Sequence, residues 1–320
     1  MRIGELQGRL GPRASRGNSQ SWRPNPRVLE DGHWLGYEEV RDKKPREDVS
    51  NLRIAYAGHD FFAPCLRTLF DHDDADVVLF LTHPAADNNK YTRELAEAAH
   101  IPIIERRLTD HYIEVFNASG IDLLVSAAYF YKIPIDRLKV KYAVNIHPSL
   151  LPFGRGGNPL PYYIDEHPDR CGLSIHELTS VIDGGPLIIQ EKIEYRSGES
   201  VDELYLKIAS AAPRLLNKLI CDLQNFFMQK KEQAKGSYWP EHAIEQRTIV
   251  ANRVQVHDVV QLHHKFGMFG IFLELNDGSV IEATQVTGNE CPHAFAAGTV
   301  IGAVKSGYIV ALQDGLLMTR

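Results

Sequence analysis

From residue 52 to residue 147 the chain alternates short apolar runs with segments of helical spacing. The apolar runs occupy 52–58, 76–83, 101–105, 121–128 and 143–147. Runs of this length between polar or glycine-containing stretches predict buried strands. Between these runs, apolar residues recur at helical intervals in 61–70, 91–100 and 111–120. Strands alternating with helices predict an α/β fold: a doubly wound, mainly parallel sheet covered on both faces, with ligands beyond the carboxyl ends of its strands.

The pattern changes after residue 199. A long amphipathic helix is expected over 199–227, and Pro213 should kink it or split it in two. A polar linker follows, and then a helix over 256–266, a hairpin turning at Asn276-Asp277-Gly278, and two or three strands over 298–320. We therefore expect a catalytic domain over 51–232 and a small β-rich C-terminal domain over 236–320.

Residues 1–50 differ in composition from the rest. They are rich in Arg, Gly, Pro and Ser and poor in aliphatic residues. This composition predicts a flexible extension. The alternative is a segment that packs on the body or on a partner through Trp22, Trp34 and Tyr37.

Composition and charge exclude several classes. The 320 residues are 44% hydrophobic and 24% charged, which is typical of a globular protein, and the net charge of −6 provides no general attraction for nucleic acid or anionic membrane. The four cysteines form no CxxC pair, which argues against a disulfide framework or zinc knuckle. No apolar run is long enough to span a bilayer. We expect a cytoplasmic homodimer without a metal.

Candidate chemistry is concentrated in residues 143–190. Asn145 and His147 are two apart at the end of a predicted strand, so they share one face. A second predicted strand, 172–178, leads to a loop and then to Asp183, which would bring all three side chains together at neighbouring strand ends. Such a set suits acyl transfer to an amine: Asn145 and a protonated His147 would donate to the developing oxyanion, and Asp183 would raise the pKa of His147. By itself, an Asn-x-His pair at a strand end is more often structural.

Several motifs in order and spacing give the stretch a family resemblance. Asn145-Ile146-His147 is followed by SLLP, then by Gly172-Leu173-Ser174-Ile175 and by Asp183-Gly184-Gly185. The sequence from about residue 51 resembles the folate-dependent formyltransferases, a family with a Rossmann-like core that includes methionyl-tRNA formyltransferases and sugar-nucleotide N-formyltransferases.

The resemblance implies roles for individual residues. It makes Asn145, His147 and Asp183 the catalytic residues and 10-formyltetrahydrofolate the formyl donor. The loops that would enclose the folate pterin contain Lys132, Ile133 and Pro134 on one side, and Thr179, Ser180, Val181 and Ile182 on the other.

The acceptor amine is the open question. Methionyl-tRNA formyltransferases have a long basic loop after the second strand, whereas this chain has the short stretch THPAADNNK, and residues 236–320 contain five Lys/Arg and eight Asp/Glu. RNA binding normally needs a basic face. We therefore favour a nucleotide-linked amino sugar over tRNA, with a peptide or siderophore amine as a further alternative and a folate-fold binding protein without turnover as the non-enzymatic one.

Residues near the catalytic motif are candidates for acceptor binding. They are Arg155, Gly156, Gly157 and Asn158, of which Arg155 would pair with a diphosphate. Tyr162 and Tyr163 would either line the acceptor pocket or pack a short helix. Cys171 is expected to be a small packing residue. His176 is expected to be structural, with a position near the folate as the alternative. A metal site at His257, His263 and His264 is possible, but a solvent-facing helix edge explains them better.

Overall fold

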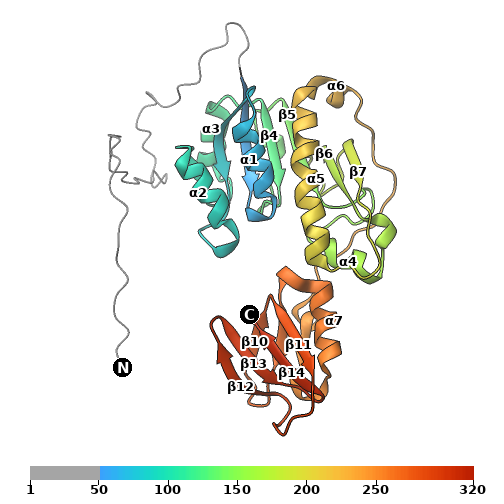
Figure 1. Ribbon diagram of the computed structural model, residues 1–320. Helices are drawn as coiled ribbons and strands as arrows, with labels where there is room; N and C mark the ends of the chain where they lie inside the picture. The colour runs from blue at the N-terminus through green and yellow to red at the C-terminus, as the bar shows by residue number, and fades with distance from the viewer. Residues whose placement is uncertain (1–50) are drawn as a thin grey trace, which may run out of the picture.

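The computed structural model describes residues 51–320, and the alternatives for Trp22, Trp34 and Tyr37 lie outside this range. Its larger part is built on one seven-stranded sheet in the order β3-β2-β1-β4-β5-β6-β7 (Figure 1). The strands are β1 (Leu52–Gly58), β2 (Ala75–Leu81), β3 (Ile103–Ile104), β4 (Leu123–Ala127), β5 (Tyr142–His147), β6 (Gly172–Glu177) and β7 (Leu187–Lys192). Neighbours from β3 to β5 pair in parallel, whereas β6 and β7 are antiparallel. The predicted mainly parallel α/β fold is confirmed.

Helices cover both faces of this sheet. The α-helices are α1 (Ala63–Asp71), α2 (Lys90–Ala98), α3 (Asp110–Ala118), α4 (Leu160–Asp165), α5 (Val201–Cys221) and α6 (Leu223–Met228), with short 3-10 helices at Asp60–Phe62, Asp87–Asn89, Ile135–Arg137 and Pro168–Arg170. Strand side chains alternate between two cores. In β1, Ile54 and Tyr56 enter the core formed with α1, α2 and α5, whereas Ala55 and Ala57 enter the core formed with α3.

The long helix α5 runs unbroken through Pro213. Of the kink or split predicted at Pro213, the split is wrong: α5 continues through Pro213, and the helix is interrupted at Asp222 instead, just before α6. Pro213 removes one backbone hydrogen bond. The fully buried stripe that includes Ile208, Ala212 and Leu216 compensates by packing the helix along its length. A capping box closes the first turn, where Glu203 N–H donates to the Ser200 hydroxyl at 3.2 Å.

The C-terminal part has a core of its own, which includes Val259, Phe266, Leu273 and Leu317. Its elements are β8 (Thr248–Val250), α7 (Val256–Phe266), β9 (Ile271–Glu274), β10 (Val280–Ala283), β11 (Val286–Glu290), β12 (Thr299–Val304), β13 (Gly307–Ala311) and β14 (Gly315–Thr319), with 3-10 helices at Ile244–Arg247, Ala251–Arg253 and Gly267–Phe269. They form a sheet β10-β9-β8 and an antiparallel sheet β11-β14-β13-β12. The predicted hairpin is β9–β10.

The C-terminal part lies beside α4 and the lower end of α5 (Figure 1). Lys265 of α7 forms an ion pair with Glu166 at 3.0 Å, and the Met268 N–H donates to Asp202 of α5 at 2.8 Å. None of the helices within residues 51–320 combines the length and the apolar character that crossing a lipid bilayer demands.

Candidate active site

The end of β5 supplies two polar side chains to one face of the sheet. Val144 and Ile146 enter the core under α5, while Ala143 enters the opposite core. Asn145 and His147 therefore share the face of Ala143, as the period of a strand requires. His147 is only 5% exposed, and Asn145 is partly buried.

Asp183 reaches these residues by a route that the sequence analysis did not anticipate. Since β6 is antiparallel to β5, its carboxyl end lies opposite Val144 and away from the end of β5. The expectation of neighbouring strand ends is therefore wrong. The loop between β6 and β7 folds back instead, and Asp183 adopts a left-handed backbone with φ of 49°. Gly185 permits the return, because a Cβ there would overlap the carbonyl oxygen of Glu177.

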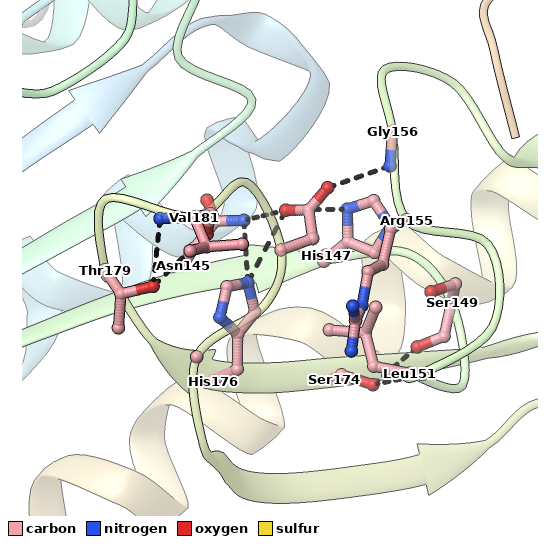
Figure 2. A network of polar contacts seen from close by, with 12 residues as sticks. Asn145, His147, Ser149, Leu151, Arg155, Gly156, Ser174, His176, Thr179 and Val181 are labelled. Atoms are coloured by element: carbon pink, nitrogen blue, oxygen red, sulfur yellow. Dashed lines mark hydrogen bonds and ion pairs between the residues drawn. The ribbon is translucent and has the colours of Figure 1, made fainter. Parts of the chain in front are cut away.

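Asn145, His147, Gly156 and His176 gather in one polar cluster (Figure 2), and the carboxylate of Asp183 is the group that contacts all four. Its Oδ2 accepts a hydrogen bond from Gly156 N–H at 2.9 Å. Its Oδ1 accepts from Asn145 Nδ2 at 3.2 Å and lies 3.7 Å from His147 Nδ1 and 3.6 Å from His176 Nε2. With 8% exposure, this is a buried carboxylate surrounded on all sides by polar nitrogen atoms.

Hydrogen-bond partners define the roles of the ring nitrogens. His147 Nε2 lies 2.7 Å from the carbonyl oxygen of Gly154, so Nε2 carries a hydrogen. His176 Nδ1 donates in the same way to the carbonyl of Glu177 at 2.9 Å, which leaves its Nε2 to accept from Asn145 Nδ2 at 3.2 Å. The amide nitrogen of Asn145 thus has both hydrogens engaged, one by Asp183 and one by His176. His176 belongs to the network, although a structural role was the favoured prediction for it.

The electrostatics of the cluster correct one expectation. Burial lowers the pKa of His147 and outweighs the opposite effect of Asp183, so the resting imidazole is neutral rather than protonated. Burial raises the pKa of Asp183, but His147, His176 and the Gly156 N–H together outweigh burial and hold the pKa at about 2. The site at rest contains a carboxylate beside a neutral imidazole.

The candidate acceptor residues line a loop that follows the cluster. Gly156 is buried against Asp183, Gly157 is exposed, and Asn158 is half-buried. Arg155 donates from Nε and Nη2 to Gln233 Oε1 at 3.1 and 2.7 Å. Gln233 was missed by the sequence analysis, since nothing in KKEQAKG distinguishes it from a linker residue.

The two tyrosines that follow this loop are packing residues. Tyr163 is fully buried, and its hydroxyl donates to the Pro148 carbonyl at 2.8 Å. Tyr162 stacks on Trp239 with 5.2 Å between ring centroids, and its hydroxyl donates to the Pro240 carbonyl. Of the two interpretations of these residues, helix packing is the one that their contacts support.

The candidate folate loops differ in character. In the first, Lys132 is exposed and Ile133 belongs to the core on the α3 face. In the second, Val181 and Ile182 are each 61% exposed immediately before Asp183. Thr179 shapes this second loop, because its hydroxyl accepts from the Val181 N–H at 3.3 Å. Pro134 is half-buried and Ser180 exposed.

Other candidates show no site chemistry. Cys171 is buried, and burial raises the pKa of its thiol to about 12, as expected of a packing residue. His263 and His264 contact the carbonyls of Thr284 and Gly198. Within residues 51–320, no group of three or more His, Cys, Asp or Glu side chains is arranged to hold a metal ion.

Comparison with known proteins places this geometry in a family. The sequence model of the family described as formyl transferase matches residues 58–220, which contain Asn145, His147 and Asp183. The chain belongs to the formyl transferase family. This formyltransferase is 28% identical over 285 residues to the methionyl-tRNA formyltransferase of Bacillus subtilis, covering 84% of this chain and 89% of that protein.

Solved structures share the fold of this formyltransferase. HypX from Aquifex aeolicus in complex with tetrahydrofolic acid has a TM-score of 0.62 at 15% identity; the match covers 85% of this chain but only 44% of HypX. The N-formyltransferase from Helicobacter canadensis, in complex with folinic acid and dTDP-3-aminofucose, has a TM-score of 0.53 at 14% identity, covering 84% of this chain and 99% of that one.

Proposed function

We propose that this enzyme transfers a formyl group from 10-formyltetrahydrofolate to the primary amine of a nucleotide-linked amino sugar. Membership of the formyl transferase family supports the transfer. The observation that carries the assignment of the site is the buried cluster in which the Asp183 carboxylate faces Asn145 and His147.

Asp183 and His147 would receive the attacking amine. His147 Nδ1 and Asp183 Oδ1 are two acceptors 3.7 Å apart, and the single ring hydrogen of His147 is committed to Gly154. An ammonium group is the complementary donor for such a pair. The bound ammonium gives up one proton to His147 Nδ1 and becomes the neutral amine that attacks the formyl carbon, and the ionised Asp183 stabilises the resulting imidazolium. The imidazolium returns this proton to the departing nitrogen as the bond from that nitrogen to the formyl carbon breaks. The neutral His147 then takes the second proton from the newly formylated nitrogen.

Asn145 would stabilise the oxyanion. Its two donor contacts, to Asp183 and His176, are both 3.2 Å, which is long for an N–H donor. Weak contacts of this kind can be replaced when a substrate oxygen approaches. An amide hydrogen from Asn145 then meets the negative charge that develops on the formyl oxygen.

The donor side fits a folate. When bound, 10-formyltetrahydrofolate supplies the formyl carbon that the amine attacks. Two neighbouring apolar side chains exposed beside a buried carboxylate, Val181 and Ile182, form a surface suited to a flat ring system. On the other wall, the side chain of Ile133 is committed to the core, so we assign that wall to backbone groups around Lys132, Ile133 and Pro134.

The proposal of a nucleotide-linked acceptor is based on the charged residues near the site. Arg155, Gly156, Gly157 and Asn158 lie in the loop between β5 and α4, and Arg155 is the cation suited to a diphosphate. The stretch 82–90, where an RNA-binding loop would lie, is short and contains a single cation, the exposed Lys90. A small anionic acceptor agrees with these features better than tRNA does.

Methionyl-tRNA is the second candidate, favoured by the similarity to the Bacillus subtilis enzyme over most of both chains. The two acceptors can be separated directly. The enzyme is incubated with 10-formyltetrahydrofolate and, in separate reactions, a panel of nucleoside-diphosphate amino sugars, methionyl-tRNA or peptide amines, and formylated products are measured by mass spectrometry. We expect transfer to a sugar amine. Transfer to methionyl-tRNA alone would assign the tRNA function, and folate binding without transfer to any amine, peptide amines included, would indicate a binding protein.

A further inference from the structure

The segment that leads from α6 to the C-terminal part is fixed to the active site. Lys231 pairs with Leu187 of β7 through two backbone hydrogen bonds of 2.7 and 2.8 Å. Seven residues later, Tyr238 forms a parallel bridge with Arg155. Between the two bridges Glu232, Ala234 and Lys235 are exposed, whereas Gln233, Gly236 and Ser237 are half-buried.

The side-chain amide of Gln233 uses its full hydrogen-bonding capacity. Nε2 donates to the backbone carbonyls of Asp183 at 2.8 Å and Gly185 at 2.7 Å. Oε1 accepts from two nitrogens of the Arg155 guanidinium at 3.1 and 2.7 Å. Two donors and two acceptor positions are all that an amide side chain offers. Its orientation is therefore defined, because a flipped amide would set oxygen against two carbonyls.

These bonds complete a closed ring of contacts that includes Asp183 of the catalytic cluster. Gln233 joins the side chain of Arg155 to the backbone of Asp183, and the carboxylate of Asp183 joins back to the N–H of Gly156, the residue after Arg155 (the labelled Arg155 and Gly156 lie side by side in Figure 2). Asp183 has a left-handed backbone, which a non-glycine residue holds only with support from its surroundings. Gln233 provides that support at the carbonyl of Asp183.

We infer that Gln233 is a positioning residue of the transfer reaction, one that sets the Asp183 carboxylate and the Arg155 guanidinium at a fixed separation. This inference rests on the proposed function for the roles of Asp183 and Arg155. Gln233 lies beyond residue 220, where the match to the family model ends. It acts through Asp183 and Arg155. Its Nε2 holds the Asp183 loop and should affect kcat, whereas its Oε1 holds Arg155 and should affect the acceptor KM.

Two variants separate the halves. Gln233→Glu keeps an acceptor for Arg155 but loses both donors to the Asp183 loop, so we expect kcat to fall about 10- to 100-fold with the acceptor KM nearly unchanged. Gln233→Met has a similar length and loses all four bonds, so we expect the same fall in kcat and, in addition, a higher acceptor KM. Gln229→Met is the matched control, because Gln229 is exposed and its side chain bonds to Asn225 alone among the described residues.

A second measurement does not depend on turnover. Hydrogen–deuterium exchange is followed for peptides covering 153–158 and 179–186, with α5 as the internal reference. In Gln233→Met, we expect exchange in the two loops to accelerate at least about tenfold. Exchange in α5 should stay at the wild-type rate, and the control should leave all three regions unchanged.

The outcomes distinguish the two proposals. If the wild-type enzyme transfers no formyl group, the proposed function fails. The exchange data still test whether Gln233 holds the two loops in place. Wild-type exchange in both loops of Gln233→Met overturns the positioning role. So does a loss of kcat matched by faster exchange in α5, because the residue would then only stabilise the fold.

Discussion

The carboxylate of Asp183 accepts a hydrogen bond from the backbone N–H of Gly156 at 2.9 Å, which ties the β6–β7 loop to the loop that follows β5. The bond leaves Oδ1 directed at Asn145 and His147. This geometry leads to separate predictions for the charge of Asp183, for Gly156, and for Trp239, whose carbonyl oxygen lies against Gly156.

The charge at Asp183 should be essential. Asp183→Asn retains an oxygen that can accept from Gly156, so the loop should hold its place. The imidazolium formed at His147 would lose its counter-charge, and we expect kcat to fall at least about a hundredfold. Single-turnover transfer measures this. Asp169→Asn removes an exposed carboxylate and should be neutral; equal activity in both variants would contradict the role of Asp183.

Gly156 should tolerate no side chain. Its φ of 123° is strained for any residue with a Cβ, and that Cβ would overlap the carbonyl oxygen of Trp239. Gly156→Ala should lower the free energy of unfolding by about 1–3 kcal/mol, measured by urea denaturation. Gly302→Ala is the control, since its Cβ would meet Ile309 at an ordinary 3.6 Å. A Gly156→Ala protein as stable as wild type would show that the loop relaxes freely.

His147 should titrate at acidic pH. Burial lowers its pKa below 6.5, so the ring is neutral in the folded protein at pH 7 while the unfolded chain binds a proton below pH 6.5. The stability that this group contributes is present above pH 6.5 and is lost as the pH falls. NMR titration of the His147 ring should give a midpoint below 6.5, and a lower one in Asp183→Asn, because Asp183 raises the pKa. A wild-type midpoint above 6.5 would mean that Asp183 outweighs burial.

Trp239 should stabilise both the fold and the site. Its buried ring stacks on His167 with 4.6 Å between centroids and lies against Gly154. Trp239→Ala should cost about 3–5 kcal/mol, measured by urea denaturation with far-UV circular dichroism, and should lower transfer activity by loosening Gly154. Phe295→Ala removes an aromatic ring that is 53% exposed and should cost much less. Equal costs would refute a special role for Trp239.

Local pattern was enough for much of the fold. The period of two in β5 placed Asn145 and His147 on one face, and the turn residues identified the β9–β10 hairpin. β7 was not predicted, because its three apolar residues are consecutive and the polar Gln190-Glu191-Lys192 follow, so LIIQEK shows no alternation. The long helix breaks at Asp222, where the backbone is not helical, whereas Pro213, the expected breaker, lies inside the continuous helix.

The site was predictable only in part. Motif spacing linked Asp183 to Asn145, but an antiparallel β6 and a loop that folds back are not encoded in that spacing. The pKa of His147 depends on how deeply the ring is buried, which no sequence distance gives. Gln233 contacts the site from 50 residues beyond Asp183 and shows no local pattern.

The two backbone bridges at Lys231 and Tyr238 have a consequence for engineering. A chimera that grafts another C-terminal domain onto this catalytic scaffold, to change the acceptor, would ordinarily be joined at the end of α6. That junction would discard Gln233 and Trp239 along with the old domain. The exchangeable unit therefore begins after Trp239, and a library of hybrids should place its crossover there.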